Sequence, residues 1–219
     1  SILWAIIFLA MIIIKWKQGK EKIEKQVFFE GLTLWELNLT VVVIAQIDTF
    51  FIAKMLDYKE LALFNIMMAI MQVFEFTRAA LFSVYSQKFA KTNNIDIKKF
   101  VRAVSVIIIL ISAFYLAGTK IILQLLFNGK YSPSFLLVVL FTAYGAINLI
   151  YVIPSCYLMG QSTKQEMRKM LGLNIVSIAI KVGAIFMLIS FKLEGFLIAS
   201  IISQGFRTLS GFYIMLKKK

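Results

Sequence analysis

Long apolar runs alternate with short charged gaps along most of the chain. Six runs reach the roughly 20 residues that a transmembrane helix needs, and a shorter apolar stretch, Ile2–Ile14, precedes them. The six are Leu32–Ala53, Leu61–Ser86, Val101–Phe127, Phe135–Gly160, Met170–Phe191 and Gly195–Leu216. Because none alternates with a period of two, the pattern favours helices over a barrel. The sequence predicts an all-α, polytopic membrane protein with seven transmembrane helices.

The two prolines of the chain predict local structure at two places. Asn128-Gly129 followed by Ser132-Pro133 predicts a tight turn, then a helix with Ser132 as its N-cap and proline in its first position. Pro154 lies inside Phe135–Gly160, where it removes one backbone hydrogen bond, so we expect that helix to bend there. The bend need not have a mechanical role.

Basic residues concentrate in every second gap between the apolar runs. These gaps hold 16 of the 24 Lys and Arg residues, whereas the intervening gaps hold only Lys54, Lys59, Lys130 and Lys192. Since cytoplasmic loops collect Lys and Arg, we expect a multi-pass protein of the cytoplasmic membrane with a cytoplasmic C-terminus. The net charge of +13 then reflects orientation and contact with anionic membrane lipids, and we expect no nucleic-acid partner.

The chain has no His and one Cys, Cys156. An intrachain disulfide, the usual metal sites and any histidine-dependent catalytic triad are therefore excluded. We expect neither a metal nor another cofactor, and no enzymatic activity.

Two neighbouring apolar runs each carry a cation near their centre. Lys181 follows Asn174 and Ser177 at helical spacing, so the three share one face. Arg207 shares a face with Ser203 and Gln204, among other small and polar residues. Ionised groups inside a span need an internal or wet environment, although the serine stripe is also compatible with simple helix packing.

Further charges lie in two other runs. Asp48 is in the outer half of Leu32–Ala53, and Glu75 and Arg78 are neighbours near the middle of Leu61–Ser86. We expect Arg78, Lys181 and Arg207, with Asn174, Ser203 and Gln204, to line a polar cavity for an anionic cargo. Asp48 and Glu75 are candidates for binding a coupling H⁺ or Na⁺. Two alternatives remain open: Glu75 and Arg78 neutralise each other, and Asp48 is a fixed partner of Lys181 or Arg207.

Several short motifs, in order, carry a resemblance to a known family. They are Gln46–Leu56, Glu60–Asn65, Leu125–Ser132, Tyr157–Ser162 and Leu193–Ala199. Together they resemble the multidrug/oligosaccharidyl-lipid/polysaccharide exporter superfamily, specifically its Wzx-like oligosaccharide flippases. The resemblance begins near Phe29 and reaches the end of the chain.

The resemblance implies a protein built from two six-helix lobes. Residues 1–27 would then be the last helix of an N-terminal lobe, followed by a cytoplasmic connector, and residues 28–219 a complete C-terminal lobe. It also implies that a polyprenyl-linked oligosaccharide crosses the cytoplasmic membrane by alternating access, for surface polysaccharide biosynthesis.

Three other functions fit parts of the pattern. A MATE-type exporter of drugs or organic cations would present acidic groups to its cargo, whereas the deep residues here lean basic. A membrane enzyme that transfers lipid-linked sugars would need acidic residues in sizeable loops. A seven-helix receptor or retinal pump does not fit the short first stretch or the position of Lys181.

Overall fold

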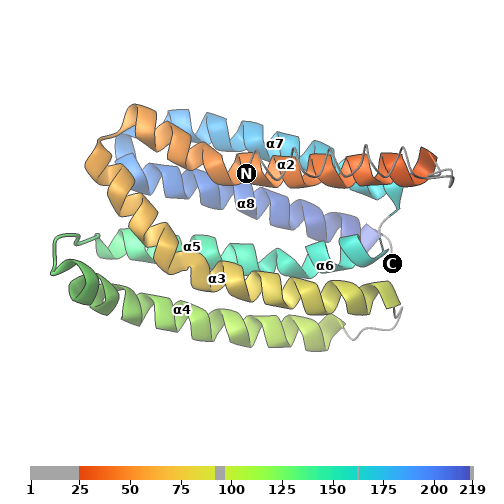
Figure 1. Ribbon diagram of the computed structural model, residues 1–219, viewed down its shortest axis with the longest axis horizontal. Helices are drawn as coiled ribbons and strands as arrows, with labels where there is room; N and C mark the ends of the chain where they lie inside the picture. The colour runs from red at the N-terminus through yellow and green to blue at the C-terminus, as the bar shows by residue number, and fades with distance from the viewer. Residues whose placement is uncertain (1–24, 92–96, 162, 218–219) are drawn as a thin grey trace, which may run out of the picture. The chain divides into compact units, whose positions relative to one another are not determined.

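A computed structural model describes residues 25–91, 97–161 and 163–217, and all regular secondary structure in these ranges is helical (Figure 1). The chain divides into two compact units, residues 1–35 and 36–219. The first contributes only the beginning of one helix to the described residues. The second, which we call the helical unit, contains every side-chain contact described below.

The predicted apolar runs from Leu32 onward all lie in helices. These helices are α2 (Lys25–Met55), α3 (Tyr58–Lys91), α4 (Ile97–Phe127), α5 (Phe135–Ile150), α6 (Val152–Gln161), α7 (Lys164–Leu188), the 3-10 helix η1 (Ile189–Phe191) and α8 (Lys192–Lys217). The predicted helix Ile2–Ile14 lies outside the described residues.

Four segments of the described chain are long and apolar enough to cross a membrane. They are Tyr58–Lys91, Ile97–Phe127, Phe135–Gly160 and Gln165–Lys217. The last contains both α7 and α8, which pack against each other. The all-α class and the presence of membrane-length helices are thus confirmed, whereas the total of seven spans stays a prediction.

The α5–α6 junction shows the effect of Pro154. Proline has no N–H to donate to the carbonyl of Ile150, four residues earlier, and α5 ends at Ile150. On the facing helix, a Cβ at Gly211 would lie 3.1 Å from the Pro154 ring. The helix is interrupted at Tyr151, close to the position where a bend was expected, and Gly211 lets α8 approach it closely.

The α4–α5 connection contains the predicted tight turn. Asn128 and Gly129 have φ values of 49° and 74°, a left-handed conformation that these two residue types tolerate. The prediction of Ser132 as N-cap was wrong, because the helix begins after Pro133. Ser134 is the N-cap: its Oγ accepts a hydrogen bond from the Leu137 N–H at 3.1 Å.

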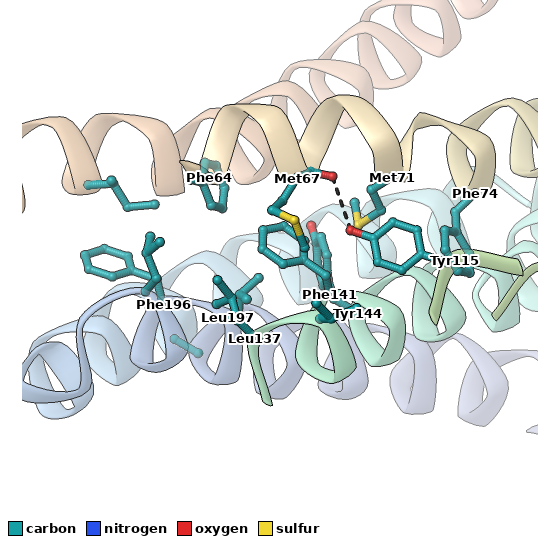
Figure 2. Close-up of a cluster of buried hydrophobic side chains, with 14 of the residues drawn as sticks. Phe64, Met67, Met71, Phe74, Tyr115, Leu137, Phe141, Tyr144, Phe196 and Leu197 are labelled. Carbon is teal, nitrogen blue, oxygen red and sulfur yellow. Dashed lines mark hydrogen bonds between the residues drawn. The ribbon is translucent and has the colours of Figure 1, made fainter. Parts of the chain in front are cut away.

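The main core lies between α3, α5 and α8. α3 packs along α5 and α6, and α8 packs against α5 (Figure 1). Figure 2 shows side chains from these three helices and from α4 meeting there: Phe64, Met67, Met71, Phe74, Tyr115, Leu137, Phe141, Tyr144, Phe196 and Leu197. The Tyr115 hydroxyl donates to the Met67 carbonyl at 3.3 Å, which attaches α4 to α3.

Small residues allow these helices to approach one another. A Cβ at Gly145 in α5 would lie 2.7 Å from the Phe74 ring, and one at Gly160 in α6 would lie 2.6 Å from the Phe89 Cβ. Such contacts are typical of helix association in membranes, where close van der Waals packing replaces the hydrophobic effect.

The chain reverses between α7 and α8 within a few residues. Lys192 adopts a φ of 51° at the reversal. A Cβ at Gly195 would overlap the Leu188 carbonyl oxygen, and this neighbour is backbone that cannot rotate away. Only glycine therefore fits at position 195 without displacing the turn.

We predict that Gly195→Ala destabilises the protein by about 1–3 kcal/mol, the usual cost of forcing an extra carbon into a packed site. Unfolding of the purified protein in mixed detergent micelles measures this. Gly183→Ala is the matched control, because a Cβ at Gly183 meets nothing within 4 Å. Equal stabilities for the two variants would contradict the close contact at the turn.

Candidate functional site

An ion pair between α2 and α7 is buried in the helical unit. The Lys181 Nζ donates to the Asp48 Oδ2 at 2.7 Å and to the Ile44 carbonyl at 2.8 Å. Ile44 and Asp48 are four residues apart, so both acceptors lie on one face of α2. The Ser200 hydroxyl, from α8, donates to the same carboxylate at 2.9 Å. One charged cluster therefore joins three helices.

The pair is almost fully shielded. The Lys181 side chain is 1% exposed and that of Asp48 is 5% exposed. The sequence is compatible with Asp48 as a fixed partner of Lys181 or of Arg207, and the structure shows the pairing with Lys181. Since an unpaired buried charge is costly, each residue requires the other in this conformation, and Lys181 does not face a cavity.

Two serines join α7 to α8. The Ser177 and Ser203 hydroxyls lie 2.8 Å apart, and each is also within hydrogen-bond distance of the other residue's carbonyl oxygen, at 3.1 and 2.9 Å. Ser203 and Gln204, both predicted to line a substrate cavity, are 1% and 4% exposed. In this structure Ser203 therefore takes part in packing between α7 and α8, as the alternative of simple helix packing for the serine stripe states.

Arg207 occupies a different environment from Lys181. Its Nε donates to the Asn174 Oδ1 at 2.9 Å, and its guanidinium carbon lies 4.3 Å from the centre of the Tyr151 ring. The Asn174 amide in turn donates to the Thr40 hydroxyl at 3.3 Å. Among the described residues, Arg207 has no carboxylate within ion-pair distance. It is a half-buried cation with no acidic partner in the part of the chain that the structure describes.

The interrupted α5–α6 helix positions the ring under Arg207. Tyr151 lies at the break that Pro154 causes, and a Cβ at Gly211 would lie 3.5 Å from the Tyr151 ring. Gly211 is one helical turn beyond Arg207, so the close helix approach and the cation–π contact share one face of α8. Proline, glycine and tyrosine together set the orientation of the guanidinium.

Glu75 and Arg78 form the second ion pair. The Arg78 Nε donates to the Glu75 Oε2 at 2.7 Å, and the side chain of Arg78 is 37% exposed and that of Glu75 is 30% exposed. Gln72, three residues earlier, is exposed. The structure therefore shows the alternative in which Glu75 and Arg78 neutralise each other within one helix. These polar groups remain partly accessible near the middle of a membrane-length helix.

The expectation of one common chamber is not met by this arrangement. The predicted residues fall into three groups, centred on Lys181, Arg207 and Arg78. No member of these groups lines either of two pockets, of about 510 and 590 Å³, that are found among the described residues. The physical reason is that buried opposite charges on facing helices pair with each other in preference to remaining unpaired.

Three residues that contact the predicted site residues were not themselves predicted: Ser200, Thr40 and Tyr151. Ser200 could have been identified from helical spacing, since it lies seven residues before Arg207 on the same helix face. Thr40 similarly lies eight residues before Asp48. Tyr151 had no direct signal, because only the packing of two helices brings its ring beneath Arg207.

The described residues contain no group of three or more His, Cys, Asp and Glu side chains that could hold a metal ion. Comparison of the chain with protein-family models, curated proteins and solved structures found no match.

We predict that Asp48→Asn lowers the free energy of unfolding by about 3–5 kcal/mol, because Lys181 is left as a buried, unpaired cation. Titration with a denaturing detergent measures the change. Asp57→Asn is the control, since Asp57 is exposed in the α2–α3 turn. Equal stability of Asp48→Asn and the wild type would show that the pair does not form.

Proposed function

We propose that this chain forms a lobe of a transporter that moves a polyprenyl-linked oligosaccharide across a membrane by alternating access. The cargo is an amphipathic anion whose phosphate or pyrophosphate group must be recognised within the bilayer. The observation that carries the proposal is Arg207, a cation in the interior of a membrane-length segment with no acidic partner among the described residues.

The guanidinium of Arg207 suits a phosphate. It offers five N–H donors in a planar fork that binds phosphate oxygens in a bidentate manner. Only the Nε is used within the described protein, by Asn174. Contact with Tyr151 restrains the plane of the group. The remaining N–H groups of the guanidinium are thus oriented, and no described residue accepts a hydrogen bond from them.

The half-exposed Glu75–Arg78 pair supports a polar route through the membrane. Charged side chains facing hydrocarbon cost about 2.5–3.5 kcal/mol each even on the most lenient scale. This face of α3 is therefore better explained by contact with water or with another protein surface than by contact with lipid. A hydrophilic glycan needs such a surface as it crosses.

The Asp48–Lys181 pair provides a chemically reasonable point for coupling to an ion gradient. Addition of H⁺ or Na⁺ at the carboxylate would remove the attraction that holds Lys181 to α2, and would loosen the junction of three helices. Ser200 is already within hydrogen-bond distance of both carboxylate oxygens. Alternating access requires an element of this kind, with two arrangements of similar energy.

The membrane and the orientation are also part of the proposal. The alternation of Lys and Arg between apolar runs supports the cytoplasmic membrane, with the C-terminus in the cytoplasm. The biological role would be surface polysaccharide biosynthesis.

Charge balance favours this function over export of organic cations. Two acids within the described helices are compensated, Asp48 by Lys181 and Glu75 by Arg78. Arg207, by contrast, has no carboxylate within ion-pair distance among the described residues. A MATE-type cation exporter requires the opposite balance, an uncompensated acid.

We predict that Arg207→Gln reduces flipping of a fluorescent polyprenyl pyrophosphate-linked oligosaccharide by about tenfold or more, since charge-assisted hydrogen bonds contribute about 1.5–3 kcal/mol. The assay follows movement of the label across proteoliposomes that contain the purified protein. Arg168→Gln is the matched control, because Arg168 is an exposed arginine in α7, and we expect it to leave the rate unchanged.

Other results would exclude the proposal. Equal flipping by wild type and Arg207→Gln would remove the cationic site, and proton-driven accumulation of an organic cation in its place would favour multidrug export. Turnover of a sugar donor by the same vesicles would identify an enzyme.

A further inference from the structure

A cleft between α4 and α5 is separate from all the charged groups considered so far. Its volume is about 510 Å³, within the range of about 300–1,000 Å³ that is typical of ligand pockets. Its lining includes Leu116, Ala117, Lys120 and Gln124 of α4, Ser132 of the α4–α5 turn and Val138 of α5. The walls are mostly apolar, and the α4–α5 turn closes one end.

The two walls of the cleft are formed by side chains of α4 and of α5. The α4 residues occur at spacings of three, four and one, which place them on a single helix face. Phe135 and Val138, on the first turns of α5, form the other side. Leu116 is 39% exposed and Phe135 is 78% exposed. The cleft therefore opens at the surface of the helical unit rather than into its core.

One cation lies in this apolar setting. Lys120 is exposed and lies seven residues before the end of α4, which is about 10 Å from the helix end at 1.5 Å per residue. It has no carboxylate within ion-pair distance among the described residues. Glu194, near the start of α8, accepts a hydrogen bond from Ser134 and does not line the cleft.

We propose that the cleft binds an anionic glycerophospholipid from the surrounding bilayer. The ammonium group of Lys120 contacts the lipid phosphate, and Gln124 and Ser132 supply further hydrogen-bond donors beside it. One acyl chain follows the apolar wall formed by Leu116 and Val138. A long lysine stem with its charge toward the head-group region is the usual arrangement near the end of a membrane helix.

The shape of the cleft favours a lipid over a free phosphate ion. A free ion would use only the few polar groups and would leave the apolar walls hydrated. A phospholipid covers those walls and neutralises Lys120 in the same event. This inference does not depend on the proposed transport function, because neither Arg207 nor the Asp48–Lys181 pair lines the cleft.

Native mass spectrometry of the full chain, released from vesicles with equal amounts of phosphatidylglycerol and phosphatidylcholine, tests the proposal. We expect the wild type to retain phosphatidylglycerol preferentially. Lys120→Gln should reduce this preference about fivefold, the effect expected of one lysine beside an anionic lipid. Lys130→Gln is the matched control, since Lys130 is an exposed lysine in the adjacent turn that does not line the cleft.

A second variant tests the cleft without altering its charge. Ala117→Phe places a ring in the space for the acyl chain, so we expect loss of the bound lipid although Lys120 is retained. Circular dichroism verifies that each variant is folded. Equal retention of both lipids by the wild type would overturn the proposal. So would an unchanged preference in Lys120→Gln, an equal loss in Lys130→Gln, or displacement of the lipid by glycerol 3-phosphate at similar concentration.

Discussion

The buried contact between Asp48 and Lys181 is the interaction on which the rest of the helical unit depends. It joins α2 to α7, and Ser200 extends it to α8. Neither charge is stable alone in an apolar interior, so the three helices must meet at this point. The serine contacts between α7 and α8 and the position of Arg207 lie along the same helix faces. A single electrostatic requirement thereby determines the relative register of three helices.

The same requirement explains why the charges have different roles. Asp48 with Lys181, and Glu75 with Arg78, are compensated, and the first pair is hidden while the second is partly accessible. Arg207 is held by an amide and an aromatic ring, which orient a guanidinium without neutralising it. A structural ion pair and an anion-binding candidate can thus lie on adjacent helices without interfering with each other.

Much of the helical architecture could be predicted from the sequence, because membrane helices require long apolar runs and each run is bounded by charge. Helical spacing likewise placed Asn174 and Lys181 on one face of α7. Helical spacing cannot show which residues of other helices pack against that face of α7. Asp48 lies 133 residues before Lys181, and only packing decides whether the two side chains meet or line a shared cavity. Tyr151 beneath Arg207 is a second contact that only packing creates.

A double-mutant cycle between Asp48 and Lys181 tests the central claim most directly. Asp48→Leu, Lys181→Met and the double variant are compared with the wild type by their free energies of unfolding. If the buried pair organises the unit, the double variant is far more stable than the sum of the single losses predicts, with a coupling of about 2–3 kcal/mol or more. Strictly additive losses would show that the two side chains act independently and would contradict this account.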